Sequence, residues 1–298
     1  MRIAIASGKG GAGKTTVTSS LAAVWDRSCV LVDADVEAPN LHLFLTPDIT
    51  RTIPVNLEVP ILDRDRCTVC GICRDFCRFK AIARLGKKIS VFADMCHGCG
   101  GCLDLCPEKA LSPGARELGE LLSGTALGGR HAFLMGRARI GESMTPPQLR
   151  ALLAELEAIL GKPDAPYREA LIDVPPGVSC PAMTACGNAD LILLVAEPTP
   201  FGFHDFKLAH SAFGSTGKML SVVINRTGMP GNRQGDDELR FYCHERGLPV
   251  LAELPFSHEA ARAYASGRVP GLISENWSAR FVELREAIRK VGKSRAVA

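Results

Sequence analysis

A glycine-rich stretch near the N-terminus has the spacing of a phosphate-binding loop. Residues 8–15 read Gly-Lys-Gly-Gly-Ala-Gly-Lys-Thr and match the pattern G-x-x-x-x-G-K-[ST]. In such a loop backbone N–H groups point at phosphate oxygens, and the N-terminus of the following helix adds a favourable dipole. The pattern predicts that Lys14 reaches the β- and γ-phosphates and that Thr15 ligates Mg²⁺. The residues predicted to bind the nucleotide here are Gly8, Gly10, Gly11, Ala12, Gly13, Lys14, Thr15 and Thr16.

The same glycines also fit the dinucleotide-binding pattern G-x-G-x-x-G, and Asp33 follows at a suitable distance. Two features favour a mononucleotide. Lys14 and Thr15 complete the phosphate-loop pattern but have no role in a dinucleotide turn. Asp173 ends a later apolar run and would hold Mg²⁺ through water. The sequence therefore predicts that the cofactor is ATP with Mg²⁺.

Eight of the twelve cysteines lie in two copies of the spacing C-x₂-C-x₂-C-x₃-C, and Pro107 follows the second copy. Bacterial ferredoxins with two [4Fe–4S] clusters have this spacing, and in them the fourth cysteine of each run ligates the other cluster. The pattern predicts two clusters. One is expected on Cys67, Cys70, Cys73 and Cys106, and the other on Cys77, Cys96, Cys99 and Cys102.

Zinc is the alternative metal, because paired C-x-x-C motifs also bind it. A zinc site has no need of the third closely spaced cysteine that occurs in both copies here, so the spacing favours iron and sulfur. The other four cysteines are scattered and are predicted to be small buried hydrophobic residues: Cys29, Cys180, Cys186 and Cys243.

Outside the cysteine-rich stretch, short apolar runs alternate with helical patterns. The expected strands are residues 2–6, 28–33, 131–135, 169–174, 190–196, 219–225 and 249–254. The expected helices are residues 14–25, 147–160, 204–213, 236–246, 257–266 and 276–290. Nearly continuous apolar strands separated by helices indicate an α/β fold with a mostly parallel sheet and helices on both faces, as in P-loop NTPases.

This alternation stops between about Pro60 and Pro113, where Cys and Gly interrupt the apolar runs. So short a segment has too little core to fold unless an inorganic group holds it together. We therefore expect a P-loop domain in two parts, at residues 1–59 and 114–298, with an inserted α+β ferredoxin-like domain at residues 60–113. The insertion carries nine Lys and Arg against six Asp and Glu, which favours an acidic redox partner.

Lys9 gives residues 9–15 the form K-G-G-x-G-K-[ST], which resembles the MinD/ParA/Mrp-type ATPases, a group with a deviant Walker A motif that includes the nitrogenase iron protein. The resemblance covers the chain outside the insertion. It implies ATP hydrolysis in an ATP-dependent homodimer, or in a heterodimer with a paralogue, where Lys9 contacts the nucleotide of the partner subunit. It also makes Asp35 the switch I carboxylate that orients water, with Asp33 near Mg²⁺. The catalytic residues expected are Lys9, Lys14 and Asp35.

Three further residues are expected at the nucleotide. Gly177 follows Asp173 after two prolines, and its backbone could approach the γ-phosphate closely. Asn225, followed by Arg226, and Pro255, followed by Phe256, each end a predicted strand. In the relatives these positions frame the adenine, and the Asn side chain contacts the edge of the base.

Together these motifs predict an ATP-binding and ATP-hydrolysing iron–sulfur protein that couples nucleotide state to electron transfer. One alternative is a carrier or scaffold ATPase for iron–sulfur or metallocofactor assembly, and another is a spatial organiser like ParA and MinD. Eight permanent cysteine ligands favour redox work over delivery, because a carrier should hold labile clusters through few exposed ligands. The remaining partner is an unidentified redox or cluster-accepting protein.

Composition limits the other possibilities. The net charge of the 298 residues is only +3, so no nucleic-acid partner is expected. Apolar runs such as residues 191–196 are too short to span a bilayer, and residues 1–6 lack the features of a signal peptide. We therefore expect a cytoplasmic protein without stable membrane insertion. The apolar stripe at residues 281–290 is expected to pack on the sheet.

Overall fold

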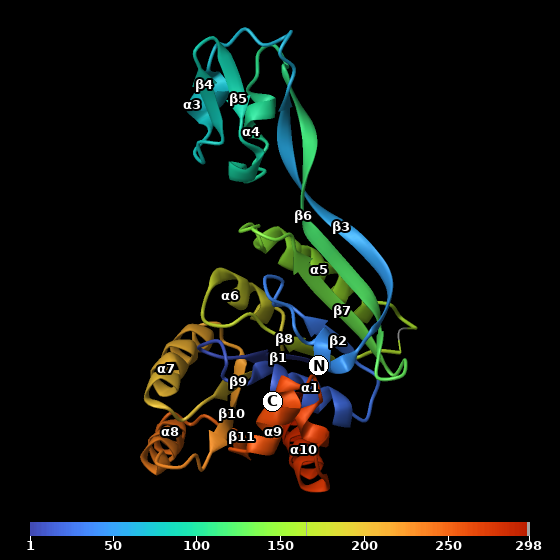
Figure 1. The fold of residues 1–298 in the computed structure, drawn as a ribbon, viewed down its shortest axis with the longest axis vertical. Coiled ribbons are helices and arrows are strands. Elements are labelled where there is room, and N and C mark those ends of the chain that lie inside the picture. The colour runs from blue at the N-terminus through green and yellow to red at the C-terminus, as the bar shows by residue number, and fades with distance from the viewer. Residues whose placement is uncertain (165, 297–298) are drawn as a thin grey trace. The chain divides into compact units, whose positions relative to one another are not determined.

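The structure is a computed structural model that describes residues 1–164 and 166–296. It divides the chain into two compact units, each built from stretches that are separate in the sequence (Figure 1). The first unit comprises Met1–Ile53, Leu121–Arg137 and Leu149–Ala298. The predicted α/β architecture lies in this unit.

A large, mostly parallel sheet forms the centre of the first unit. Its strands are hydrogen-bonded in the order β11-β10-β9-β1-β8-β2-β7-β6-β3. From β11 to β7 in this order, every strand runs parallel to its neighbours. The strand bounds are β1 (Arg2–Ala6), β2 (Val30–Asp33), β3 (Asp48–Leu62), β6 (Leu111–Ala126), β7 (His131–Ala138), β8 (Ala170–Asp173), β9 (Leu191–Ala196), β10 (Met219–Thr227) and β11 (Val250–Pro255).

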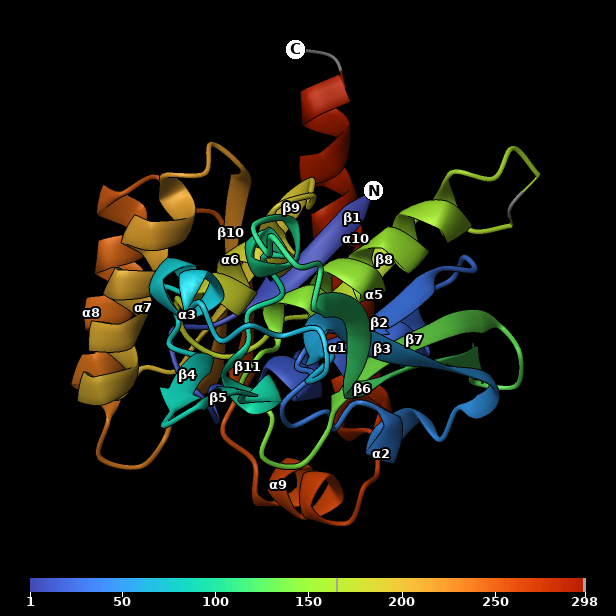
Figure 2. The same ribbon diagram turned by 90° about the horizontal axis from the view of Figure 1, so that it is seen from above.

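Helices cover both faces of this sheet (Figures 1 and 2). Helices α1 and α10 contact each other on one face, and α7 packs on β9 from the other. None of the helices described in residues 1–164 and 166–296 is both long and apolar enough to cross a membrane. The bounds are α1 (Lys14–Val24), α2 (His42–Leu45), α5 (Pro146–Leu160), α6 (Cys180–Cys186), α7 (Pro200–Gly214), α8 (Arg233–Glu245), α9 (His258–Ala265), the short 3₁₀ helix η2 (Pro270–Leu272) and α10 (Glu275–Ala296).

The C-terminal helix α10 supplies part of the main core. Phe281, Leu284 and Ile288 are fully buried and belong to one cluster with Val17 and Leu21 of α1. Their spacing of three and four residues places them on one side of the helix. The prediction that this apolar stripe packs on the sheet is confirmed.

The parallel register brings the carboxyl ends of the central strands to one edge of the sheet. Asp33 at the end of β2 is in register with Asp173 at the end of β8. Asp173 is also in register with Ile5 of β1, so the loop after β1 starts beside both carboxylates. In open parallel sheets, ligands bind at this edge.

The second unit comprises Pro54–Glu120 and Ala138–Gln148, so it extends beyond residues 60–113. Its elements are short: α3 (Ile72–Phe76), β4 (Ile82–Leu85), β5 (Lys88–Val91), the 3₁₀ helix η1 (Ala93–Met95) and α4 (Gly101–Asp104). Strands β4 and β5 form an antiparallel pair. Two small apolar clusters fill the unit, and both contain cysteines.

Strands β3 and β6 were not predicted, because prolines and glycines interrupt their sequences. Pro54 and Pro60 lie within β3, and proline cannot donate a hydrogen bond to a neighbouring strand. The alternation of buried Val55, Leu57 and Val59 with more exposed residues is nevertheless that of a strand. In β6, a Cβ at Gly124 would lie 1.9 Å from the carbonyl oxygen of Asp48, so the glycine permits the close approach of these strands.

Replacing Phe281 by alanine should lower the free energy of unfolding of the first unit by about 3–5 kcal/mol, because the change leaves a cavity in a closed core. The control Leu272→Ala should cost less than about 0.5 kcal/mol, because Leu272 is 56% exposed. Urea unfolding followed by tryptophan fluorescence measures both, since Trp25 and Trp277 lie in the first unit. Equal losses in the two variants would contradict the packing described for α10.

Candidate functional site

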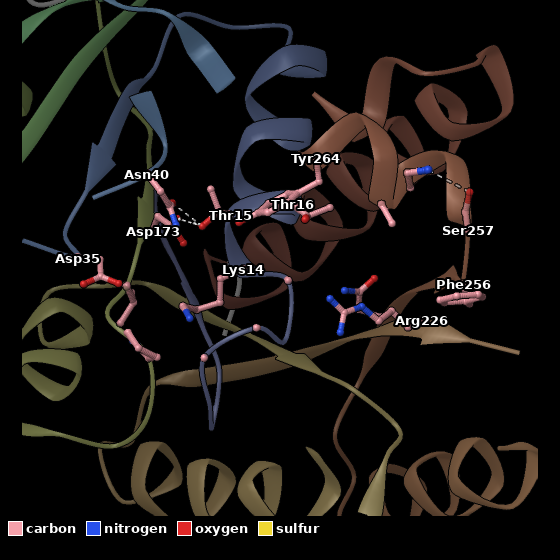
Figure 3. Close-up of a pocket in the computed structure, with 18 of the residues that line it drawn as sticks. Lys14, Thr15, Thr16, Asp35, Asn40, Asp173, Arg226, Phe256, Ser257 and Tyr264 are labelled. Atoms are coloured by element: carbon pink, nitrogen blue, oxygen red, sulfur yellow. Dashed lines mark hydrogen bonds between the residues drawn. The ribbon is translucent and has the colours of Figure 1, made fainter. Parts of the chain in front are cut away.

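A pocket of about 320 Å³ lies in the first unit at the carboxyl edge of the sheet. Figure 3 shows Lys14, Asp35, Asn40 and Asp173 toward one end and Arg226 toward the other. Most of the residues predicted for the nucleotide line it: Gly10, Gly11, Gly13, Lys14, Thr15, Thr16, Asp35, Asp173, Asn225 and Pro255. The volume is within the range of small-molecule sites in proteins.

The phosphate loop ends where α1 begins at Lys14. Gly13 precedes the helix with a left-handed φ of 103°, and no side chain caps the first turn. The amide nitrogen Nδ2 of Asn225 donates to the carbonyl oxygen of Ala12 at 2.8 Å. A Cβ at Gly13 would lie 2.1 Å from this nitrogen, so only glycine fits. The helix N-terminus therefore remains open to an anion.

Lys14 is a buried cation inside the loop. Its Nζ donates to Ser7 Oγ at 3.0 Å, and burial lowers its pKa against the opposing effect of nearby aspartates. A buried ammonium with one neutral partner is poorly compensated, because transfer from water costs it solvation. The geometry favours an anionic ligand at this point.

Oxygen atoms converge on Thr15 from two other segments. The hydroxyl of Thr15 lies 2.7 Å from Oδ2 of Asp173 and 2.9 Å from Oδ1 of Asn40. Thr18 also reaches Asp173, at 3.3 Å. Carboxylate, amide and hydroxyl oxygens are suitable ligands for Mg²⁺. Asn40 was not predicted, although it lies in the same short stretch as Asp33 and Asp35.

The two aspartates after β2 have different surroundings. Asp33 is fully buried, and its oxygens accept hydrogen bonds from the backbone N–H groups of Asp35, Asn40 and Leu41. It thus holds the loop in place and does not line the pocket. Asp35 is half-buried and lines the pocket, and burial raises its pKa.

Burial makes it energetically unfavourable for the carboxylates at this edge of the sheet to be ionised. Burial raises the pKa of Asp173 to about 6, although Lys14 and Thr15 act in the opposite direction. Burial, reinforced by the charge of Asp173, raises the pKa of Asp33 well above its usual range. A divalent cation would offset both charges.

Five predicted residues do not line the pocket: Asp33, Ala12, Lys9, Gly8 and Gly177. The Nζ of Lys9 forms an ion pair with Glu197 at 2.9 Å. Gly8 lies against the backbone of Asp205, where a Cβ would be 2.1 Å from the carbonyl oxygen. The N–H of Gly177 donates to the carbonyl oxygen of Ser7 at 3.0 Å. In this structure these residues shape the loop.

Arg226 and Phe256, which follow the predicted Asn225 and Pro255, also line the pocket. Arg226 has a left-handed φ of 64°, which is uncommon for a residue with a side chain. Among the lining residues that were not predicted, Tyr264 and Trp277 are aromatic residues on predicted helices, and this was the signal that could have pointed to them. The lining residues not predicted are Ala38, Asn40, Val174, Pro176, Ser257, Ala260, Ala261, Tyr264 and Trp277.

The second unit has two pockets, each lined by four cysteines. One is lined by Cys67, Cys70, Cys73 and Cys106. The other is lined by Cys77, Cys96, Cys99 and Cys102. The structure thus brings together the same two groups of cysteines that the spacing predicts, including the exchange of the fourth cysteine between the two runs.

The thiols in these pockets affect one another. Burial raises the pKa of Cys102 to about 11, and the neighbouring sulfurs of Cys96 and Cys99 add to the effect. The backbone N–H of Gly98 lies 3.4 Å from Cys96 Sγ, and that of Ala110 lies 3.2 Å from Cys106 Sγ. Across residues 1–164 and 166–296, no three His, Cys, Asp or Glu side chains converge closely enough to hold a single metal ion.

The four other cysteines differ in exposure. Cys29, Cys186 and Cys243 are buried, as predicted. The prediction is wrong for Cys180, which is exposed. Cys180 is the first residue of the short helix α6, where an apolar pattern cannot specify the buried face.

The chain matches known proteins over most of its length. Residues 3–270 match the family model described as CobQ/CobB/MinD/ParA nucleotide binding domain. The "Uncharacterized protein MJ0578" of Methanocaldococcus jannaschii is 33% identical over 234 residues, which cover 77% of this chain and 79% of that protein.

Solved structures share the fold. The cell division ATPase MinD of Pyrococcus furiosus has 21% sequence identity and a TM-score of 0.55, with 97% of this chain and 98% of that chain covered. The septum site-determining protein MinD from Pyrococcus horikoshii OT3, complexed with Mg-ADP, has 19% identity and a TM-score of 0.56, with coverages of 97% and 96%. At these identities the likeness is one of fold.

Replacing Asp173 by asparagine should stabilise the ligand-free chain above pH 6. Because the pKa of Asp173 is raised to about 6, its folded-state ionisation costs stability as pH rises from about 4 through 6. The variant lacks this cost, so its free energy of unfolding at pH 7.5 should exceed that of the wild type by about 1–3 kcal/mol. Urea unfolding at pH 5 and pH 7.5 measures the difference.

The control for this experiment is Asp237→Asn, which removes an exposed carboxylate of α8. Its pH dependence should equal that of the wild type. The explanation fails if Asp173→Asn loses stability between pH 5 and 7.5 as steeply as the wild type.

Proposed function

The chain belongs to the CobQ/CobB/MinD/ParA family of nucleotide-binding proteins, which includes the MinD and ParA ATPases, and from this premise we propose that it hydrolyses ATP and carries two [4Fe–4S] clusters. Its nucleotide state controls electron transfer through those clusters. The observation that carries this proposal is the presence in one chain of a phosphate-loop pocket and of two pockets lined by four cysteines each.

In the proposed ATPase site, the open N-terminus of α1 and Lys14 bind the phosphates. Thr15, Asp173 and Asn40 supply the oxygen atoms around Mg²⁺, directly or through water. Asp35 faces this end of the pocket and orients the attacking water. The solved MinD structure with Mg-ADP supports a magnesium nucleotide in a pocket of this fold.

Asn225, Pro255 and Phe256 line the pocket. These three residues bind the adenine in the proposed complex. Asn225 now donates to Ala12 through Nδ2, so its side chain links the base end of the pocket to the phosphate loop.

The cysteine pockets fit an iron–sulfur cluster better than a single ion. Burial raises the pKa of Cys73 and of Cys102, and neighbouring sulfurs add to the effect, so these two thiols remain protonated until a cation replaces the protons. A cluster places iron at several corners and accepts sulfurs that are too far apart for one metal ion. Backbone N–H groups at Cys96 and Cys106 would tune the reduction potential. When bound, the clusters supply one-electron transfer.

The chain itself links the two activities. The loop that carries Asp35 leads through α2 into β3, and within β3 the chain passes from the first unit into the second. It returns within β6. A displacement of the loop therefore has a covalent route to the cysteine unit, which supports control of electron transfer by the nucleotide.

The proposed redox partner is an acidic protein. Residues 78–88 contain five exposed cations and no acidic residue: Arg78, Lys80, Arg84, Lys87 and Lys88. This segment directly follows Cys77 and includes Phe79, which lines the same pocket. An acidic donor or acceptor would be attracted to this segment. ATP-dependent pairing of two copies, or of a copy with a paralogue, completes the proposal.

Two alternatives have specific support. Cys70 and Cys99 are exposed, one in each pocket, which favours a carrier or scaffold for cluster or metallocofactor assembly because a recipient could reach the cluster. The similarity to MinD structures described as a cell division ATPase and as a septum site-determining protein favours a spatial organiser, with the clusters as structural elements.

The anaerobic protein should contain about eight irons and eight labile sulfides per chain. The double variant Cys96→Ala/Cys99→Ala should fall to about four of each, because it removes two of the four ligands of one cluster. The control Cys180→Ala changes an exposed cysteine outside both pockets and should keep the full content. Iron and sulfide analysis measures all three, and stoichiometric zinc without sulfide would reject the clusters.

Nucleotide binding should shift the cluster potential by about 40–130 mV, the one-electron equivalent of a coupling free energy of about 1–3 kcal/mol. The measurement is a redox titration without nucleotide, with ADP and with a slowly hydrolysed ATP analogue. Lys14→Ala is the matched control, because a chain that cannot bind phosphate should show one potential throughout. Identical potentials in wild type, with ATP hydrolysis intact, would favour the carrier.

A further inference from the structure

Glu197 is a nearly buried carboxylate with no role in the site described so far. Its side chain is 9% exposed, and it follows the last residue of β9. The backbone beyond it is fixed at two points. The carbonyl oxygen of Pro198 accepts from Asn232, and Thr199 caps α7 by accepting from the N–H of Gly202. The backbone next to Glu197 is therefore held in place by hydrogen bonds.

Two cations from separate segments bind this one carboxylate. Lys9 of the phosphate loop contacts Oε2 at 2.9 Å, and Arg226 after Asn225 contacts Oε1 at 2.9 Å. Burial acts to raise the pKa of Glu197, but the hydrogen bonds from both cations outweigh it and hold the pKa below its usual value. The carboxylate of Glu197 is thus ionised and forms an ion pair with both cations.

We propose that Glu197 is a positioning residue that clasps Lys9 and Arg226 in the nucleotide-free chain and withholds Lys9 from a second copy of the protein. Nucleotide binding opens the clasp. The withholding half of this inference rests on the proposed ATP-dependent pairing. The clasp itself rests on the contacts of Glu197 alone.

Because Glu197 pairs with both Lys9 and Arg226, the Lys9–Glu197 ion pair can break at low cost. A buried carboxylate that loses its only cation is strongly destabilised, because an uncompensated charge remains. Here Arg226 stays on Oε1 when Lys9 leaves Oε2, so the charge of Glu197 keeps a partner. A single Lys9–Glu197 pair would hold the lysine more firmly.

Both ends of the nucleotide pocket connect to the clasp. At the phosphate end, Lys14 Nζ donates to Ser7 Oγ at 3.0 Å, and that hydroxyl donates to the carbonyl oxygen of Lys9 at 2.7 Å. A phosphate that recruits Lys14 removes the first of these bonds. At the other end Arg226 lines the pocket, where a bound base would meet it. A nucleotide therefore acts on groups bonded to Lys9 and to Glu197 at once.

The test uses Glu197→Gln, which keeps the shape and removes the charge. Competitive acetylation of lysines, read by mass spectrometry in the nucleotide-free protein, should label Lys9 about fivefold faster in the variant, the upper range for one partly exposed ion pair. The control Glu253→Gln removes the Glu253–Arg240 pair elsewhere in the first unit and should leave Lys9 labelling unchanged. Equal labelling of Lys9 in wild type and Glu197→Gln overturns the clasp.

The second measurement is sedimentation with a slowly hydrolysed ATP analogue. Glu197→Gln should lower the concentration at half-dimerisation about fivefold, and adding Lys9→Ala should abolish the dimer. Faster labelling with equal dimerisation of wild type and variant would overturn the withholding role. Faster labelling with no dimer in any protein supports the clasp and counts against the proposed pairing.

Discussion

The burial of two carboxylates at the ends of neighbouring strands is the main electrostatic constraint on the first unit. Asp33 and Asp173 are in register across β2 and β8, and neither is exposed to water that could stabilise its charge. The surrounding groups stabilise both carboxylates through hydrogen bonds. Backbone N–H groups of the following loop bind Asp33, and hydroxyl groups of α1 bind Asp173. The loop and the helix are thereby fixed to the sheet edge where a magnesium nucleotide would supply the missing positive charge.

In the second unit, the buried groups with chemical function are the thiols of cysteines and not the carboxylates of aspartates. Its two apolar clusters are small, and each includes cysteines among its buried members. The same side chains therefore provide packing and line the pockets. A unit with so little apolar core would gain stability from any group that its thiols bind.

Local spacing predicted much of the molecule. Seven of the nine strands of the sheet, the phosphate loop and the grouping of the cysteines follow from residues that lie close together in the sequence. The long strands β3 and β6 were missed because their prolines and glycines argue against strands locally, while pairing with a distant partner decides the outcome. Asn40 and Glu197 were missed for a similar reason. Lys9 stands in a recognisable motif, but its partner Glu197 is contributed by a strand end far along the chain.

The order of strands in the sheet also decides the order of events during synthesis. Strand β1, which leads into the phosphate loop, lies between β8 and β9, and both of these follow the whole of the second unit in the sequence. The ribosome therefore releases every cysteine of the two pockets while β1 still lacks both of its neighbours. Domains fold as units as they emerge. The cysteine unit is therefore synthesised in full before the two strands that flank β1, and it can fold on a nascent chain whose nucleotide pocket does not yet exist.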